Sequence, residues 1–241
     1  MNGLIGFTNL VLKCGFQAST FTMSFDRAIL NDINRASITI GPHNFTVQPL
    51  NVAVNGLDSG ILQGAETWYQ VFVVSDGTSA GAVISLNQTA PVLPAGMTHW
   101  ALAGCAQVLS LGPTKMLGLL QISNRVTTQS YGVLPVPGVA ANAANTYQIK
   151  NMAREVSPIA KTISGYMGAP TGKDCQMSIT ADGSVDLGRV NANAVGLATP
   201  FDGAGCTVPF NDFALSTPQT LYWKSIDTLQ RNILYLTSFT I

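Results

Sequence analysis

Two histidines, His43 and His99, are the only imidazole groups in the 241-residue chain. Ser-His-Asp or Cys-His catalysis would have to recruit one of them. His43 stands in the sequence Gly-Pro-His-Asn-Phe, which is typical of a turn, and His99 precedes Trp100 in an expected strand. Neither lies near a nucleophile motif such as Gly-x-Ser-x-Gly. We therefore expect both histidines to be structural.

Paired carboxylates could act as the acid and base of a glycosidase. Asp182 and Asp186 are close in the sequence, but Gly183 makes Asp182 a turn residue. Glu66 stands before an expected buried strand, where it can stay solvated. The chain has twelve acidic residues and no cluster of them. We expect no catalytic residues and interpret the chain as a non-enzyme.

Residues 168–174, GAPTGKD, superficially suggest a phosphate loop. The motif requires four residues between its glycines and Ser or Thr after the lysine, whereas this stretch has three and Asp174. We interpret it as an ordinary loop. The calcium-binding pattern D-x-D-x-D-G is also absent. The sequence therefore predicts neither a cofactor nor a metal ion.

The four cysteines are widely separated and show neither a C-x-x-C pair nor the spacing of zinc ligands. They are Cys14, Cys105, Cys175 and Cys206. Their even number permits two disulfides, but a chain of this length needs no covalent staples. We predict four buried thiols in a protein that assembles in a reducing cytoplasm.

Signals for export are weak. Residues 1–16 are apolar, yet they lack a basic start and an A-x-A cleavage site, so we expect no secretion signal. The glycosylation sequons at residues 44–46 and 87–89 then carry no meaning. No apolar run approaches the roughly 18 residues that span a bilayer. Because Leu10 and Leu12 alternate with Val11 and Lys13, this segment can add as a strand to a sheet of its own subunit or of a neighbour.

Aromatic side chains could instead form a platform on which carbohydrate rings stack. Those in expected strands have core packing as their default role: Trp68, Tyr69, Trp100, Tyr222 and Trp223. Those in expected loops are better candidates for exposed contacts: Tyr131, Tyr147 and Phe201.

The chain is poor in charge. It is 46% hydrophobic and 10% charged, against about 25% charged in an ordinary soluble domain, and its formal net charge is zero. Such a chain gains little solubility from self-repulsion, so we predict a homo-oligomer, a trimer or a ring, that packs against other proteins. The alternative is a surface built from Ser, Thr, Asn and Gln. Without a basic stripe, nucleic-acid binding is not expected.

Alternation of apolar and polar residues predicts strands at residues 20–25, 38–40 and 45–47. Residues 68–74 are apolar on both faces apart from Gln70, which predicts a central strand that is covered on both sides. Further strands are expected at 98–109, 221–223 and 233–241. A turn of helix at 151–156 would end before Pro158.

Turn signals separate these strands. Three dipeptides accept positive φ and are expected to close hairpins: Asn55-Gly56, Asp76-Gly77 and Asp182-Gly183. Pro91 and Pro94 bracket a short loop. We predict an all-β, antiparallel, jelly-roll-like sandwich, as one large domain or two small β subdomains. The linker-like composition of residues 131–145 divides the chain into 1–130 and 131–241; the alternative is one continuous sandwich.

Four motifs resemble a recurrent pattern of tailed-bacteriophage virion proteins. NGLDSG (55–60), TWYQVFVV (67–74) and APVLPAGMTHW (90–100) are similar to N-G-L-D-T-G, T-W-Y and APTLPAGYT in those proteins. PQTLYWK (218–224) is similar to their TIYW strand. The resemblance extends from about residue 7 to residue 241 and is strongest over 55–109. The chain departs from the pattern in MNGLIGF (1–7) and CGFQ (14–17), and it lacks a long fibre shaft.

The resemblance implies a structural protein of the virion, because these motifs carry no catalytic residue. Such proteins are mostly described as tail or tail-fibre components. The expected role is thus a fibre, fibre-adaptor or tail-tip subunit that binds other virion proteins, without insertion into a membrane. The alternatives are a capsid decoration or head-fibre protein, and a receptor-binding protein for a host surface glycan.

Overall fold

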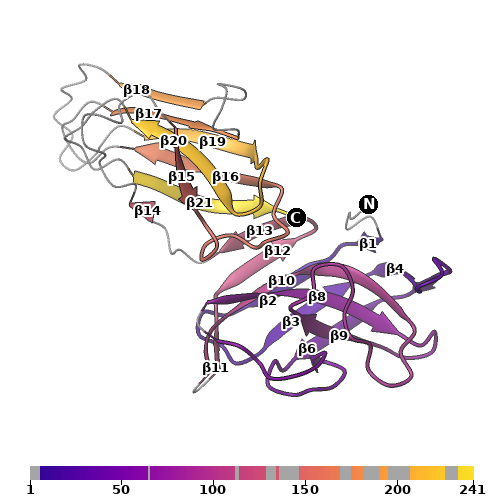
Figure 1. Cartoon of the computed structure of the whole chain (residues 1–241). Helices are drawn as coiled ribbons and strands as arrows, with labels where there is room; N and C mark the ends of the chain where they lie inside the picture. Colours follow the sequence, from indigo (N-terminus) through magenta and orange to yellow (C-terminus); the bar gives the residue numbers. More distant parts are fainter. Residues whose placement is uncertain are drawn as a thin grey trace. The chain divides into compact units, whose positions relative to one another are not determined.

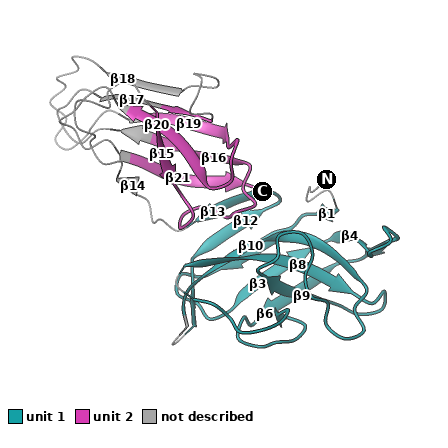
Figure 2. Ribbon diagram, viewed as in Figure 1, with its two compact units in different colours: residues 1–129, 241 teal, residues 130–240 magenta. Residues whose placement is uncertain are grey.

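The computed structural model describes residues 6–64, 66–111, 114–128, 134–135, 147–168, 175–181, 190–194, 207–225 and 233–241. Its regular elements in these ranges are all β-strands (Figure 1). The chain forms two compact units, Met1–Gln129 with Ile241 and Ser130–Thr240 (Figure 2). The composition of the sequence places the division after residue 130. The prediction of an all-β protein is confirmed.

Unit 1 contains two sheets. Sheet A consists of β1 (Phe7–Thr8), β4 (Arg27–Asn31), β5 (Ser37–Ile40), β7 (Gly56–Leu57), β8 (Thr67–Ser75), β9 (Ala80–Ser85), β10 (His99–Leu111) and β11 (Thr114–Met116). Its strand order is β1-β4-β10-β8-β9-β7, with β5 beside β4 and β11 beside β10. The short strand β7 runs parallel to β9, whereas the other pairs are antiparallel.

Sheet B of this unit consists of β2 (Val11–Cys14), β3 (Phe21–Phe25), β6 (His43–Val47), β12 (Leu119–Ile122) and β13 (Arg125–Thr128), in the order β13-β12-β2-β3-β6. The two sheets pack as layers (Figure 1). Between them, Gln121 Nε2 on β12 donates a hydrogen bond to the carbonyl of Ala103 on β10, at 2.7 Å. A side chain at Gly104 would collide with this amide. The predicted antiparallel sandwich is confirmed.

The apolar N-terminal segment supplies an internal strand of its own unit. β2 lies between β3 and β12, paired with both. Leu10, Leu12 and Cys14 are buried, whereas Lys13 is exposed. Alternation in the sequence therefore corresponds to alternation in burial. The same is true of β3, where Phe21, Met23 and Phe25 are buried as predicted.

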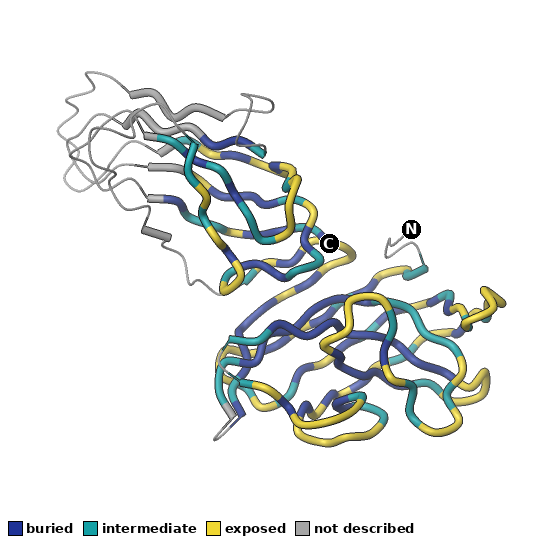
Figure 3. Tube along the Cα trace, in the orientation of Figure 1, coloured by how far each residue is buried: buried dark blue, intermediate teal, exposed yellow. Residues whose placement is uncertain are grey.

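Strand β8 is covered on both faces, as its sequence predicts. All its residues after Thr67 are buried, Gln70 included. Phe72 and Val74 form a cluster with Val83, against which Leu93 and Met97 of the 86–98 loop pack. Figure 3 shows this strand within the buried interior, while the connecting loops are largely exposed. The proline-containing loop thus serves as the outer cover of sheet A.

The turn dipeptides differ in outcome. Asp76-Gly77 closes the β8–β9 hairpin with Gly77 at φ 93°, which confirms the prediction. Asn55 also has a positive φ of 65°, but the hairpin expected at Asn55-Gly56 is wrong. The chain instead enters β7, because this segment finds its partner in β9. Asp182-Gly183 lies outside the described residues.

Unit 2 consists of β14 (Leu134–Pro135), β15 (Gln148–Asn151), β16 (Thr162–Gly168), β17 (Cys175–Thr180), β18 (Val190–Ala194), β19 (Thr207–Ala214), β20 (Thr220–Ser225) and β21 (Ile233–Thr240). β19-β16-β21 are consecutive neighbours, with β14 beside β21, and β15-β20-β17-β18 form a second sheet. At 151–156 the backbone makes one turn, in which the N–H of Val156 donates to the carbonyl of Met152 at 2.9 Å. Of the linker-like residues 131–145, only 134–135 are described.

A candidate docking site at the edge of sheet A

The two histidines both lie on strands of unit 1. His43 is not in a turn as expected but on β6, where its ring stacks on Phe25 and Phe45 with centroids 5.8 and 5.3 Å away. Its Nδ1 lies 3.0 Å from the carbonyl oxygen of Gly41. His99 begins β10, and its Nδ1 lies 2.8 Å from Thr98 Oγ1. The two rings therefore belong to different sheets of unit 1.

Of the candidate acids, the structure describes Glu66. Glu66 has a φ of 65° just before β8, and its carbonyl accepts a hydrogen bond from Gln107 Nε2 at 2.9 Å. Asp182, Asp186 and residues 169–174 lie outside the described residues. Within the described ranges, no group of three His, Cys, Asp or Glu side chains is arranged to hold a metal ion.

Cys14 and Cys105 are buried, and neither forms a disulfide. Burial raises the pKa of the Cys14 thiol to about 12, so this thiol stays protonated at neutral pH. The side chains of Cys175 and Cys206 lie outside the described part of the chain.

The aromatic residues of the strands are mostly internal. Trp68, Tyr69 and Trp223 are buried, and Trp100 and Tyr222 are half-buried. Tyr147 is half-buried too, with the Lys224 ammonium 4.4 Å from its ring centroid. Tyr131 and Phe201 lie outside the described residues.

Three of the sequence motifs come together at the β7 edge of sheet A. The N–H of Asn55 donates to the carbonyl of Ala82 at 2.7 Å, and its side-chain Oδ1 accepts the Ala82 N–H at 2.9 Å. Gly56 follows where a Cβ would collide with the carbonyl of Asn51. Leu57 is then buried against β9. Each of these positions of the NGLDSG motif therefore has a structural reason.

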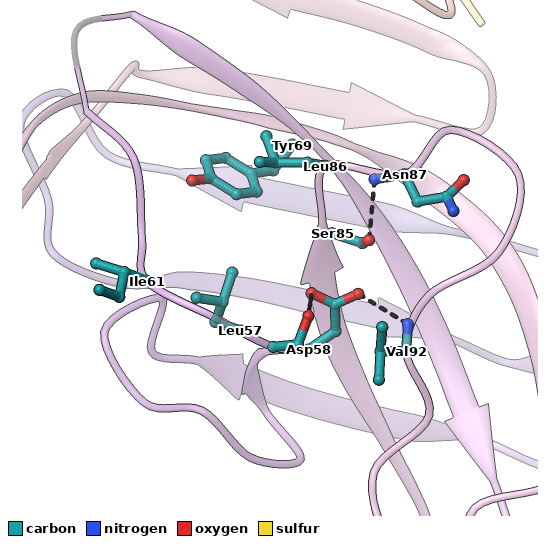
Figure 4. A pocket seen from close by; sticks show the side chains of 9 residues that line it. Leu57, Asp58, Ile61, Tyr69, Ser85, Leu86, Asn87 and Val92 are labelled. Atoms are coloured by element: carbon teal, nitrogen blue, oxygen red, sulfur yellow. Dashed lines mark hydrogen bonds between the residues drawn. The ribbon is translucent and has the colours of Figure 1, made fainter.

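Asp58 joins this motif to the proline-containing loop. Its N–H donates to the carbonyl of Ile84 at 3.0 Å, which continues the pairing with β9. Its Oδ2 accepts the N–H of Val92 at 2.8 Å, across 34 residues of sequence (Figure 4). The carboxylate thus holds the loop whose Leu93 and Met97 cover the sheet.

Tyr69 ties the TWY motif to the same place. Its hydroxyl accepts the N–H of Gln63 at 2.5 Å and donates to the carbonyl of Gln63 at 3.3 Å. Burial raises the pKa of Tyr69, the Gln63 N–H lowers it, and the negative charge of Asp58 raises it further. The phenol therefore stays neutral, and its hydroxyl holds the backbone of Gln63 against β8.

A small cavity of about 160 Å³ lies between these residues (Figure 4). It is lined by Leu57, Asp58, Ser59, Ile61, Tyr69, Ser85, Leu86, Asn87 and Val92. Pockets for small molecules and cofactors are usually about 300–1,000 Å³. This cavity is therefore suited to one inserted side chain rather than to a cofactor.

Around the cavity lie three exposed apolar side chains, which we call the rim: Ile61, Leu86 and Val92. Their exposed fractions are 87%, 46% and 58%. Exposed aliphatic groups beside a hollow are typical of a protein-docking site. Sequence reasoning identified the motifs but not the rim. One sequence feature could have indicated the rim: its aliphatic residues stand among glycine, proline and asparagine in segments that connect strands.

Comparisons with models of known protein families, with curated proteins and with solved structures find no match to this chain. Among the residues that the structure describes, there is no helix long and apolar enough to cross a membrane.

Proposed function

We propose that the chain is a non-catalytic structural component of a tailed-bacteriophage virion. It is associated with the tail as a fibre, fibre-adaptor or tail-tip subunit, and it acts by packing against other virion proteins. The exposed rim around the one-side-chain cavity is the observation that carries this proposal. The resemblance of NGLDSG, TWYQVFVV and APVLPAGMTHW to phage motifs supports the choice of particle.

The rim and cavity suit an apolar side chain of a neighbouring subunit. Burial of one exposed isoleucine such as Ile61 contributes about 1.5–3 kcal/mol of transfer free energy. Asp58, the carboxylate of the site, already accepts the Val92 N–H. A neighbour can therefore cover the rim through largely apolar contact. The scarcity of charge in the whole chain supports the same mode of assembly, as a homotrimer or a ring.

Assembly in the bacterial cytoplasm, followed by residence in the virion, is the location we propose. Cys14 and Cys105 are buried without a disulfide, as suits a protein that folds in a reducing compartment. Localisation by gold-labelled antibody and electron cryomicroscopy of particles tests the role directly. Label at the tail is expected. Label on the capsid would replace the tail role by a decoration role, and unlabelled particles would contradict the proposal.

The docking role has a matched pair of variants. Ile61→Asp charges the rim, whereas Ile33→Asp alters a residue of similar exposure, 82%, in the β4–β5 connection. We expect Ile61→Asp to lower incorporation into particles, or self-association in light scattering, by about tenfold or more. Ile33→Asp is expected to behave as the unmodified chain. Equal behaviour of the two variants would contradict docking at the rim.

A further inference from the structure

The turn between β2 and β3, residues 15–18, carries an exposed aromatic ring. We call this segment the Phe16 turn. Phe16 is 50% exposed, and the other large hydrophobic residues that are exposed in the described part of unit 1 are aliphatic. The turn belongs to the CGFQ stretch, in which the chain departs from the phage pattern. The resemblance therefore assigns no role to this ring.

Backbone hydrogen bonds hold the Phe16 turn in place. The N–H of Ala18 donates to the carbonyl of Gly15 at 3.1 Å, which closes the turn. The N–H of Gln17 donates to the carbonyl of Met116 at 2.9 Å, and the N–H of Met116 donates to the carbonyl of Ala18, also at 2.9 Å. The turn is thus fixed to β11. Because its backbone is already ordered, insertion of the ring into a partner would lose little conformational entropy.

The Phe16 turn and the cavity lie at opposite sides of sheet A. Val108 on β10 is paired with Thr67 of β8 on one side and with Met116 of β11 on the other. Beyond β8 the sheet continues through β9 to β7, the edge at which the cavity lies. β11 and β7 are therefore four strand spacings apart, which is roughly 19 Å. Phe16 is too far from the cavity of its own copy and is available to the cavity of a second copy.

The cavity can accommodate a phenyl ring. Its volume is about 160 Å³, and an apolar protein cavity of about 150 Å³ binds benzene. The walls include Leu57, Leu86 and the ring of Tyr69 (Figure 4). Aromatic rings that pack against each other are stabilised beyond the effect of buried area alone. A phenylalanine side chain thus matches the cavity in size and in chemistry.

The charges beside the two surfaces are complementary. β2, β11 and the Phe16 turn contain Lys13 and Lys115 and no acidic residue. The segments that connect β7 to β8 and β9 to β10 surround the cavity, and they contain Asp58 and Glu66 and no basic residue. Asp58 lines the cavity itself. Opposite charges of this kind steer two copies toward each other and set their orientation.

We propose that unit 1 of one copy binds unit 1 of a second copy by inserting Phe16 into the cavity beside the rim. The ring packs on Tyr69 of the second copy, and Lys115 approaches Asp58. The contact rests on the docking role proposed for the rim and assigns its partner, a second copy of the chain. Because the two surfaces differ and each copy carries both, repetition of the contact builds a ring or an open chain.

Cross-linking of full-length chains tests the contact without altering the ring or the rim. Ser19→Cys places an exposed thiol beside the Phe16 turn, and Ser59→Cys places one at the cavity. The two purified variants are mixed and treated with a short bismaleimide, and the products are mapped by mass spectrometry. We expect a link between residues 19 and 59 of different chains. Ser37→Cys, exposed on β5, is the matched control and should not be linked to residue 59.

Self-association of point variants provides a second measurement. Phe16→Ala alters an exposed ring and is expected to weaken self-association, measured by analytical ultracentrifugation, by about tenfold or more. Ile33→Ala alters an exposed hydrophobic residue elsewhere in unit 1 and should associate as the unmodified chain does. Added salt should slow the association, because it screens the attraction between Lys115 and Asp58.

The outcomes separate this contact from the docking role of the rim. If Ile61→Asp weakens assembly but Phe16→Ala does not, the rim docks another partner, and the insertion of Phe16 is overturned while the docking role stands. If Phe16→Ala weakens self-association but Ile61→Asp does not, Phe16 binds elsewhere, and both are overturned. Absence of the link between residues 19 and 59, or an unmodified chain that is monomeric at every concentration, would also overturn the insertion of Phe16.

Discussion

The carboxylate of Asp58 accepts the N–H of Val92 at 2.8 Å and so connects two motifs that are 34 residues apart. The segment that contains Asp58 is paired to β9, whereas the loop that contains Val92 covers the outer face of sheet A through Leu93 and Met97. One exposed hydrogen bond therefore links an edge strand to the cover of the central strand.

Asp58→Ala removes this acceptor and should loosen the 86–98 loop. We expect a loss of about 1 kcal/mol in the free energy of unfolding, in the range of a charge-assisted hydrogen bond that is partly open to water. Hydrogen exchange of the Val92 amide should accelerate. Asp58→Asn, which keeps a neutral acceptor, should give a smaller effect. An unchanged exchange rate at Val92 in Asp58→Ala would show that the bond does not hold the loop.

Gly56→Ala places a methyl group against the carbonyl of Asn51, where the backbone leaves no room. We expect a loss of about 2 kcal/mol or more in urea denaturation, because the turn must shift away from β9. Gly41→Ala is the matched control, since no atom lies within 4 Å of an added Cβ there. If the two variants are equally stable, the tight approach at Gly56 is not needed for folding.

Asp76 gives the β8–β9 hairpin a dependence on pH. Hydrogen bonds from the N–H groups of Ser79 and Thr78 lower the pKa of Asp76 below its ordinary value of 3.8. The pKa of Asp76 is therefore lower in the folded than in the unfolded protein. The ionised carboxylate stabilises the folded protein at pH values above the unfolded-state pKa, and this stabilisation is lost as the pH falls through the folded-state pKa. Asp76→Asn should therefore flatten the decline in stability below about pH 4. Thermal unfolding of both proteins between pH 5 and 2 measures this, and parallel curves would contradict it.

Much of the fold could be predicted because strand periodicity is local. Alternation at Phe21 and Met23, and its absence in residues 68–74, were sufficient to place β3 and the doubly covered β8. The failure at Asn55-Gly56 has a tertiary cause. The dipeptide specifies a positive φ, but the partner of the following strand is β9, which comes 24 residues later.

The rim could not be predicted, since exposure in a loop depends on what the loop covers. Val92, Leu93 and Met97 are all apolar residues of one loop. Leu93 and Met97 pack on the Phe72 cluster, whereas Val92 is 58% exposed beside the cavity. The exposed and the covered positions of this loop thus carry the same type of residue, an apolar one. The difference arises from the tether at Asp58, which no local pattern encodes.

The cysteines provide a test of compartment and packing together. Because the Cys14 thiol has a pKa raised to about 12 by burial and Cys105 is buried, neither should react with iodoacetamide in the folded protein at pH 8. After denaturation without a reductant, we expect all four cysteines to be alkylated. Mass spectrometry counts the modified residues. Two or fewer modified cysteines would reveal disulfides and a different compartment.

The N-terminal segment tests whether β2 is part of the core. Deletion of residues 1–15 removes the strand between β3 and β12, so sheet B of unit 1 loses pairing on both sides of the gap. We expect the truncated chain to be insoluble on expression. Leu12→Ala, at a fully buried position, should cost about 2–5 kcal/mol in denaturant unfolding, whereas Lys13→Ala on the exposed face should change stability by about 0.5 kcal/mol or less. A truncated protein that folds and still assembles would show that β2 is dispensable, and equal effects of the two point variants would contradict its orientation.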